Sequence, residues 1–404
     1  MSQHDTITAT YRVNTPMFLG GADNTTSAEL RLSSFKGALR FWWRALVWEQ
    51  IGDVDELRRQ EADLFGSSEQ KVGQSKARLR LEELGITPTL IPPTVLRDGR
   101  RTIGPGARYL GYGVMEAFSS AKKGTKEGEL TRPCLEAPFN FTVELYVRKA
   151  TPAQRTELVR ALKALGMFGG LGSKSRKGYG SLTLLELTEP DGPGYSAPTD
   201  AAQFMAASES LGISRAASPP PFSAFSNHRI VLLPGHDESA LSLLDRIGRE
   251  LVFFRSWGHN GRVLGQQREA NFEFDHDLMK AIDSGSRNLP VKFRDAHPER
   301  VAFGLPHNYG KGKNQQVGGP EGFERRASPL FIHIHQTTDS AALGVLSFLP
   351  AQFLPEGTDL MVGGNKASIN PDTRAFYKPV HDFLDRLLEG SDKDRFVGAR
   401  EIQP

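Results

Sequence analysis

The first half of the chain carries alternating hydrophobic patterns of two different periods. Residues 7–13 (ITATYRV) alternate apolar and polar positions, which predicts a half-buried strand. Three further segments have a strand-like pattern: 76–82, 139–148 and 181–187. Helical patterns occupy residues 34–50 and 153–167. The predicted order is strand, helix, strand, strand, helix, strand, which is the ferredoxin-like or split βαβ order, with a long insertion at about 83–138.

A change in composition separates the two halves of the chain. Proline, glycine and serine dominate residues 191–226, which predicts a linker. A second domain is predicted at 227–404, and its strand-like and helix-like segments are 228–234, 238–256, 331–336, 344–350 and 381–389. Residues 304–329 are rich in glycine and basic residues and are predicted to form a mobile surface loop. The patterns therefore predict an α+β protein with domains at 1–190 and 227–404.

Residues 169–180 (GGLGSKSRKGYG) form a glycine-rich basic loop between the second helix and the last strand of the first domain. Glycines such as Gly170, Gly172 and Gly178 remove side-chain bulk, so backbone amides are able to approach an anion. Five residues add cations and hydroxyl groups: Ser173, Lys174, Ser175, Arg176 and Lys177. The order helix, loop, strand is opposite to that of the phosphate loop and the dinucleotide fingerprint. The loop therefore favours a nucleic-acid backbone over a mononucleotide.

The helix predicted at 34–50 has apolar and basic residues on separate faces. Its apolar face, which is expected to point to the core, contains Phe35, Leu39, Trp42 and Leu46. Lys36, Arg40 and Arg44 recur at every fourth position on an adjoining face. Like charges at this spacing repel one another, and no acidic residue intervenes between Arg31 and Arg44. The row of cations therefore predicts contact with an anion.

Overall composition does not by itself indicate a nucleic-acid-binding protein. The 404 residues include 50 Lys and Arg against 47 Asp and Glu, so such a role depends on local clusters. Cys134 is the only cysteine, which excludes an internal disulfide and a cysteine-based metal site. The N-terminus has no apolar signal region, and no segment approaches about eighteen uninterrupted apolar residues. These features predict a soluble, cytoplasmic protein that has no membrane partner.

Two of these motifs together resemble the signature of a known family. LRLSSFKGALRFWWRAL (30–46) and GGLGSKSRKGYGSL (169–182) look like the repeat-associated (RAMP) superfamily of CRISPR proteins. More narrowly, they resemble the first-subunit family of the Cmr, or type III-B, RNA-guided effector complexes. The resemblance covers residues 1–190 well and is thinner afterwards, in FGLP (303–306) and RRASPL (325–330).

This resemblance implies two ferredoxin-like domains and a non-catalytic role, and no cofactor or metal is expected. The implied partners are guide RNA toward its 3′ end, the complementary target RNA and the other effector subunits, whose filament this subunit would cap. The implied RNA-contacting residues lie in the basic helix and the glycine-rich loop: Lys36, Arg40, Arg44, Gly170, Gly172, Ser173, Lys174, Ser175, Arg176, Lys177, Gly178 and Tyr179. In the second domain, Arg325 and Arg326 are further candidates.

Lys177-Gly178-Tyr179-Gly180 matches the start of the RNP1 pattern of RNA-recognition motifs. Residues 181–184 lack the aromatic side chains on which that motif stacks bases. The expected contacts are therefore with the RNA backbone and carry little sequence specificity, as suits a protein whose guide supplies the sequence information.

Two other functions stay open on the sequence alone. Some relatives in this superfamily cleave guide precursors without metal, using a histidine or tyrosine as general base, and the candidates here are His4, His259 and His307. His333 and His335 alternate on one predicted strand, but without a third ligand they predict a structural pair rather than a metal site. The other alternative is a purely architectural subunit whose basic faces meet acidic partners.

Overall fold

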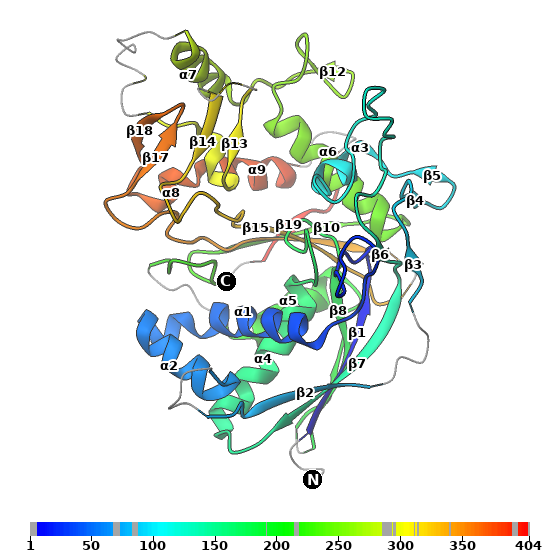
Figure 1. Ribbon diagram of the computed structural model, residues 1–404. Helices are drawn as coiled ribbons and strands as arrows, with labels where there is room; N and C mark the ends of the chain where they lie inside the picture. The colour runs from blue at the N-terminus through cyan, green and yellow to red at the C-terminus, as the bar shows by residue number, and fades with distance from the viewer. Residues whose placement is uncertain are drawn as a thin grey trace.

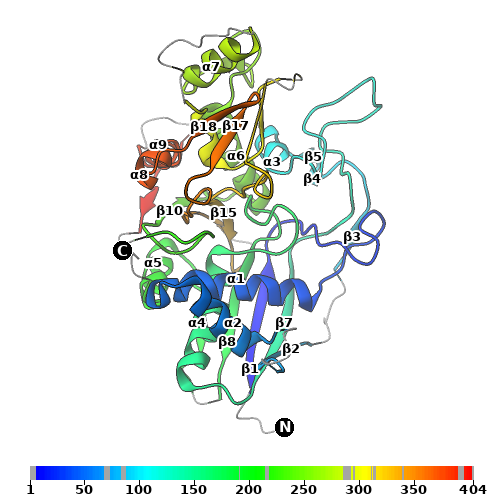
Figure 2. The ribbon, with the colours of Figure 1, turned by 60° about the vertical axis from the view of Figure 1, so that its left-hand side comes forward.

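The computed structural model contains two larger antiparallel β-sheets, each with helices packed on it (Figure 1). The structure describes residues 6–67, 73–82, 88–190, 192–213, 218–284, 293, 296–310, 312, 315–338, 341–389 and 395–402. The sheet of the first half lies toward one end of the molecule and the second half lies beyond it, as the turned view also shows (Figure 2). Among the described residues, no helix is long and apolar enough to cross a membrane.

The first sheet has the strand order β2-β7-β1-β8-β9, and all neighbouring strands are antiparallel. Its strands are β1 Thr6–Val13, β2 Ala77–Leu81, β7 Phe139–Val147, β8 Leu182–Thr188 and β9 Tyr195–Ser196. Buried and more exposed positions alternate along β1 and β7, as the sequence pattern predicted. Helices α1 (Leu32–Ile51) and α4 (Pro152–Phe168) cover the buried face, where the hydroxyl of Tyr11 donates to the carbonyl oxygen of Leu162.

Local sequence signals set the ends of these helices. The hydroxyl of Thr151 accepts the amide of Gln154, and the Gln154 side chain accepts the amide of Thr151, which forms a capping box at the start of α4. Gly52 ends α1 with a φ of +62°, a conformation that glycine adopts readily. The carboxylate of Asp53 then caps the next helix, α2 (Val54–Phe65).

The second sheet repeats the strand arrangement of the first, with the order β15-β16-β10-β19. Its strands and main helices are β10 Arg229–Pro234, α6 Ala240–Arg255, β15 Leu330–His335, β16 Leu343–Phe348, α9 Lys378–Leu388 and β19 Arg400–Glu401. In both sheets, the second, third, first and fourth core strands along the chain lie side by side in that order. All of these elements except β19 lie at segments that the sequence patterns predicted.

Strands β15 and β16 are buried along their whole length. Phe331 and Val345 on one side belong to the core shared with the first sheet and its helices. Ile332 and Leu346 on the other side belong to the core that includes α6 and α9. Cover on both sides explains why the two strands are mostly apolar, and the polar exceptions His333, His335 and Ser347 are buried as well.

The described residues of 191–226, a segment that the sequence predicts as a linker, are packed against the first sheet and its helices. The segment contains β9 and a helix, α5 (Ala201–Ser210). Phe204 and Phe225 are buried, and both contact Phe168 of α4. The composition of the segment does not indicate these contacts, because the two aromatic side chains that anchor it lie among many serines and prolines.

The insertion at about 83–138 fastens the first half of the chain to the second. Its elements are β3 Leu90–Ile91, β4 Arg97–Asp98, β5 Arg101–Thr102, α3 Pro105–Leu110 and β6 Cys134–Leu135. Helix α3 lies against α6 in both ribbon views (Figures 1 and 2). A Cβ on Gly106 would lie 2.0 Å from the carbonyl oxygen of Asp245, so only glycine permits this approach. The carboxylate of Asp245 accepts the amide of Ala107 at 2.9 Å.

The segment 304–329 does not match the predicted mobile surface loop, because part of it pairs into a third sheet. This sheet has the order β13-β14-β17-β18, with bounds His307–Asn308, Gln316–Gly318, Asp359–Val362 and Asn365–Ser368. Val317 of β14 is buried against residues of β17 that lie far along the chain, a contact that local composition does not reveal. The remaining described elements are β11 Arg262–Val263, β12 Gln266–Gln267, α7 Glu273–Asp283, the 3-10 helix η3 Glu299–Phe303 and α8 Thr373–Phe376.

Candidate nucleic-acid interface

The glycine-rich loop, residues 169–180, lies where the two large sheets meet. A backbone bridge joins Lys177 to Ile332 of β15, and the amide of Ile332 donates to the carbonyl oxygen of Arg176 at 3.0 Å. The hydroxyl of Thr15 donates to the carbonyl oxygen of Gly178 at 2.6 Å. The loop is therefore fixed between the two halves and does not stand free on a surface.

Packing within the protein explains why the loop needs its glycines. Gly172 has a φ of +87°, and a Cβ there would lie 2.6 Å from the carbonyl oxygen of Phe18. A Cβ on Gly170 would lie 2.7 Å from the carbonyl oxygen of Gly180. The sequence-based explanation, that the missing side chains open space for an anion, is corrected here: the protein's own backbone fills the space.

Most backbone amides of the loop are engaged within the protein. Seven of them donate to carbonyl oxygens: those of Gly169, Leu171, Ser173, Ser175, Lys177, Tyr179 and Gly180. Within the described part of the chain, four half-buried residues of the loop have an amide without an acceptor: Gly170, Gly172, Lys174 and Arg176. These four amides are therefore the backbone donors that stay available to an external anion.

Gly178 and Tyr179 are packing residues, which corrects their assignment as RNA contacts. Tyr179 is fully buried, and its hydroxyl donates to the carbonyl oxygen of Ala107 in α3 at 2.8 Å. A Cβ on Gly178 would lie 2.4 Å from the side chain of Leu244 in α6. These two residues hold the loop to the insertion and to α6, so the partial RNP1 match has no stacking role.

Lys177 also points away from solvent at its charged end. Its Nζ atom is buried and has no hydrogen-bond partner among the residues that the structure describes. Burial, reinforced by the charges of Arg255, Lys174 and Arg176, lowers the pKa of Lys177 to about 7. A buried ammonium of this kind does not suit the surface phosphate contact that the sequence predicts for it.

Arg176 spans the junction between the sheets. Its guanidinium lies 5.3 Å from the ring centre of Phe41 and 4.5 Å from that of Phe331, and it donates to the carbonyl oxygen of Ser328 at 3.0 Å. Burial first, and then the charge of Arg326, lowers its pKa to about 10. Arg176 thus stays cationic at neutral pH, and it has no carboxylate partner in the described ranges.

A pocket of about 250 Å³ opens between α1, the glycine-rich loop and β15. Its lining residues are Ser34, Ala38, Phe41, Trp42, Gly169, Gly170, Leu171, Gly172, Ser175, Arg176 and Phe331. The rings of Phe41 and Phe331 stack with centroids 5.6 Å apart. The structure therefore brings together the two motifs that the sequence pairs, and it places Gly170, Gly172, Ser175 and Arg176 in one site.

The cation row of α1 faces away from this pocket, toward α2. The side chain of Glu61 in α2 accepts from Arg40 Nε at 2.7 Å and from Arg44 Nη1. Lys36 Nζ donates to the carbonyl oxygen of Phe65 at 2.9 Å and to Ser75 Oγ at 3.2 Å. Glu61 therefore supplies within the protein the anion that the sequence pattern predicts, and contact of Lys36, Arg40 and Arg44 with RNA stays a prediction.

The two arginines suggested in the second domain differ from each other. Arg326 donates to the carbonyl oxygens of Gln352 at 2.8 Å and Pro221 at 3.1 Å, so it ties two loops together. Arg325 is exposed. Only Arg325 is thus free to meet a ligand without giving up hydrogen bonds.

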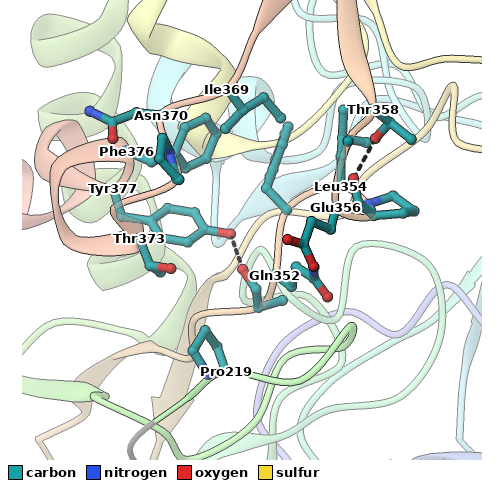
Figure 3. Close-up of a pocket in the computed structure, with 15 residues that line it drawn as sticks. Pro219, Gln352, Leu354, Glu356, Thr358, Ile369, Asn370, Thr373, Phe376 and Tyr377 are labelled. Atoms are coloured by element: carbon teal, nitrogen blue, oxygen red, sulfur yellow. Dashed lines mark hydrogen bonds between the residues drawn. The ribbon is translucent and has the colours of Figure 1, made fainter.

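A separate pocket of about 430 Å³ lies in the second half, beside α8 (Figure 3). Tyr377 donates to the carbonyl oxygen of Ala351 at its inner end. The residues that line this pocket include one carboxylate, Glu356, and no Lys, Arg or His. Its charge is therefore unsuited to an RNA backbone.

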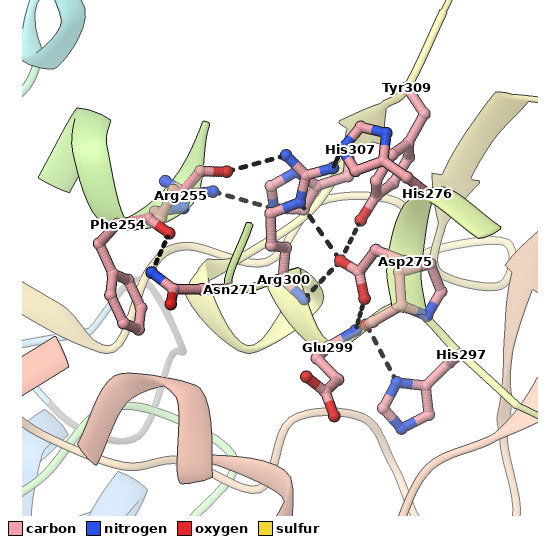
Figure 4. Close-up of polar contacts among 11 residues, drawn as sticks. Phe254, Arg255, Asn271, Asp275, His276, His297, Glu299, Arg300, His307 and Tyr309 are labelled. Atoms are coloured by element: carbon pink, nitrogen blue, oxygen red, sulfur yellow. Dashed lines mark hydrogen bonds and ion pairs between the residues drawn. The ribbon is translucent and has the colours of Figure 1, made fainter. Parts of the chain in front are cut away.

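Of the candidate catalytic histidines, His4 lies outside the described residues, and His259 and His307 lie apart from the pocket formed by α1 and the loop. His259 is exposed next to the β11–β12 hairpin. His307 contacts Arg255 Nη2 at 3.3 Å, and burial followed by the charges of Arg255 and Arg300 keeps its pKa well below the usual value. Figure 4 shows His307 within a network in which Arg300 donates to the buried carboxylate of Asp275. His307 thus belongs to an interior polar network.

His333 and His335 connect β15 to the first half of the molecule. Nδ1 of His333 donates to the carbonyl oxygen of Gly169 at 2.8 Å, and Nε2 of His335 donates to that of Pro198 at 2.8 Å. Burial is the main cause that lowers their pKa values, to about 3 and about 4. Among the described residues, no three His, Cys, Asp or Glu side chains gather as metal ligands.

Comparison with known proteins identifies the class of the first half. Residues 10–183 match the family model of the RAMP superfamily. The chain is similar to the CRISPR system Cmr subunits Cmr1-2 and Cmr1-1 of Pyrococcus furiosus, at 28% identity to each. The first match covers 43% of this chain and 92% of the relative, and the second covers 39% and 41%. The resemblance that the two motifs carry is thus confirmed.

A solved structure supports the fold over the rest of the chain. The crystal structure of Cmr1 from Pyrococcus furiosus, in its apo form, matches with a TM-score of 0.51 over 98% of both chains. The identity is 15%, so the match shows a shared mixed α and β fold.

The sequence pattern misses the aromatic part of the pocket. Phe41 lies off the apolar face of its helix and stacks on Phe331, which lies in a strand almost 300 residues further along the chain. Ala38 and Ser34, one and two turns before Phe41 and Trp42, complete the helix side of the pocket. The helical spacing of Ser34, Ala38 and Phe41 was the sequence signal for this side of the pocket. The signal is weak because small residues on a helix rarely indicate a binding site.

Proposed function

We propose that this protein is a non-catalytic RNA-binding subunit of a type III-B CRISPR effector complex. It acts in the cytoplasm, holds the 3′ region of the guide RNA or the guide–target duplex, and caps one end of the row of sibling subunits. The observation that supports the proposal is the pocket in which α1 and the glycine-rich loop meet. The similarity to Cmr subunits supports the effector assignment.

The chemistry of the pocket suits an RNA backbone. Arg176 supplies a positive charge without a carboxylate partner in the described chain, and the free amides of Gly172 and Arg176 supply neutral donors. Phe41 supplies part of an aromatic wall for a sugar or base. None of these groups reads a base edge, so the contact positions the RNA and leaves sequence recognition to the guide.

We infer further that each large sheet and its two main helices form a ferredoxin-like domain, at 1–190 and 227–404. The shared strand order of the two sheets supports this inference. Residues 191–226 connect the two domains while packing on the first.

A salt series of binding to labelled single-stranded RNA tests the proposal, with the variant Ser175→Asp beside the wild type. A carboxylate within the pocket repels a phosphate a few ångströms away, so we expect about tenfold weaker binding at low salt. Ser196→Asp, on an exposed position of β9, adds the same charge away from the pocket and is the matched control.

Three outcomes contradict parts of the proposal. Equal binding by both variants places the RNA elsewhere on the protein. No binding by the wild type at low salt favours the architectural subunit. Cleavage of the RNA in EDTA, lost on His307→Ala or His259→Ala, favours the metal-independent endoribonuclease.

A further inference from the structure

Two aromatic side chains of the insertion project into solvent. Tyr112 is 72% exposed and Phe118 is 77% exposed, which exceeds every other large apolar side chain that the structure describes. Aromatic surface exposed to this extent is a candidate contact surface. Tyr112 is the more informative of the two, because its backbone is held firmly.

The turn that carries Tyr112 is anchored on both sides. Leu110 and Val114 are buried at 3% and 2% exposure, and the amide of Val114 donates to the carbonyl oxygen of Gly111 at 2.9 Å. A backbone bridge pairs Tyr112 with Met115. The exposed ring therefore stands on a fixed base, so ordering it against a ligand costs little conformational entropy.

The same turn lies against a cation of the glycine-rich loop. A Cβ on Gly113, the residue after Tyr112, would lie 3.9 Å from Lys174 Nζ. The amide of Thr131 donates to the carbonyl oxygen of Val114 at 3.0 Å, which brings Arg132 beside the turn.

Among the residues that the structure describes, these two cations have no partner of opposite charge. After burial, the nearby charge of Arg132 is the cause that lowers the pKa of Lys174, so the two charges interact. Across the described ranges, neither Lys174 nor Arg132 has a side-chain hydrogen bond or an ion pair. Two neighbouring cations without a carboxylate leave room for an external anion.

We propose that Tyr112, Lys174 and Arg132 form a second contact with single-stranded RNA. A nucleobase stacks on the ring of Tyr112, and the adjoining phosphate lies between Lys174 and Arg132. This inference rests on the proposed RNA-binding function and adds the insertion to it. Lys174 precedes Ser175 and Arg176 of the pocket, so a strand that leaves the pocket passes Lys174 before it reaches Tyr112.

RNA fits this surface better than a protein partner does. Binding sites for single-stranded nucleic acid combine a row of cations with exposed aromatic rings, since every base has a face on which it stacks. Protein–protein interfaces are enriched in tyrosine and arginine but depleted in lysine, so Lys174 is the residue that favours RNA over a protein. The insertion thereby has two roles: α3 joins the halves, and the turn after α3 presents Tyr112.

The test uses RNA in which 2-aminopurine replaces each base in turn, bound by the full-length protein. Stacking on Tyr112 is expected to quench one position, and Tyr112→Ala is expected to remove that quenching and weaken binding by roughly 5- to 150-fold. Tyr112→Phe should keep both properties, whereas Tyr112→Leu, which is apolar but not aromatic, should lose them. Replacing Lys174 and Arg132 together by alanine should reduce the salt slope by about 1.4.

The outcomes separate this inference from the proposed function. If Ser175→Asp weakens RNA binding but Tyr112→Ala leaves affinity and quenching unchanged, the second contact is refuted and the pocket stands. If Tyr112→Ala instead abolishes capture of sibling subunits with RNA affinity intact, the surface is a protein-docking site and the inference is wrong. If the wild type binds no RNA, both proposals fail. Unchanged thermal melting of the Tyr112 variants excludes misfolding as the cause of any loss.

Discussion

Replacing Glu61 by glutamine separates a structural role of the α1 cation row from an RNA-binding role. The substitution keeps the shape of the side chain and removes its charge. Glu61 is the shared partner of Arg40 and Arg44, and its side chain is 9% exposed. If these arginines serve the fold, the variant loses stability, and if they serve RNA, it loses little stability and gains affinity.

The size of the stability loss follows from the burial of the three side chains. Removing one partner of a fully buried pair costs about 3–5 kcal/mol, and an exposed pair contributes about 0.2–1 kcal/mol. Arg40 and Arg44 are 40% and 28% exposed, so water still solvates them when the carboxylate is lost. We therefore expect the free energy of unfolding to fall by about 1.5–3 kcal/mol.

Urea denaturation measures this loss, and Glu56→Gln in the same helix is the matched control. Glu56 pairs with Arg59, whose side chain is 75% exposed, so the control should lose less than about 1 kcal/mol. RNA affinity and its salt slope should be the same for both variants and the wild type. The reasoning is refuted if Glu61→Gln keeps its stability, binds RNA more tightly and steepens the salt slope by about 0.7 per added phosphate contact.

Three further predictions follow from buried groups at the junction. The pKa values of His333 and His335 are lowered to about 3 and about 4, so between about pH 6.5 and pH 4 only the unfolded state takes up their protons. The free energy of unfolding should therefore be full above about pH 6.5 and fall toward about pH 4 by about 1.4 kcal/mol per pH unit for each histidine. A urea midpoint that does not change over this pH range would contradict this prediction. Lys177→Met should raise stability at neutral pH by about 1–3 kcal/mol and leave the RNA salt slope unchanged, whereas a slope smaller by about 0.7 would show that Lys177 contacts phosphate. Gly172→Ala, at a φ of +87° and with its Cβ 2.6 Å from Phe18 O, should lower thermal stability by more than about 2 kcal/mol, and a neutral result would mean that the loop is not packed in this way.

Local patterns predicted the elements because the cause of each element is local. Alternation along residues 7–13 follows from one face of β1 being covered by α1 and α4, and the mostly apolar sequence of β15 follows from cover on both sides. The sequence also linked α1 with the glycine-rich loop, because the two motifs together are specific to a family. These signals are enough for the order of strands and helices and for the place of the site.

The faces of the site were not predictable, because distant residues decide them. The spacing of Arg40 and Arg44 gives information only about their own helix, whereas Glu61, which neutralises both, lies in the next helix. In the same way, the glycines of the loop look like an anion cradle until Phe18 and Gly180 are found in the space that they leave. Pairing across the fold thus reassigns cations and glycines whose local pattern suggested a ligand.

The pocket belongs to both halves of the molecule, which has a consequence for how RNA binding responds to acid. Phe331 of β15 supplies one wall, and His333, two residues further on, donates to the carbonyl oxygen of Gly169 at the start of the loop. Acid that weakens the docking of β15 therefore displaces Gly169 and Phe331 together. RNA binding should then be lost in the same pH range as stability, although Arg176 stays charged throughout, and binding that persists after β15 has separated from the loop would place the RNA on one half alone.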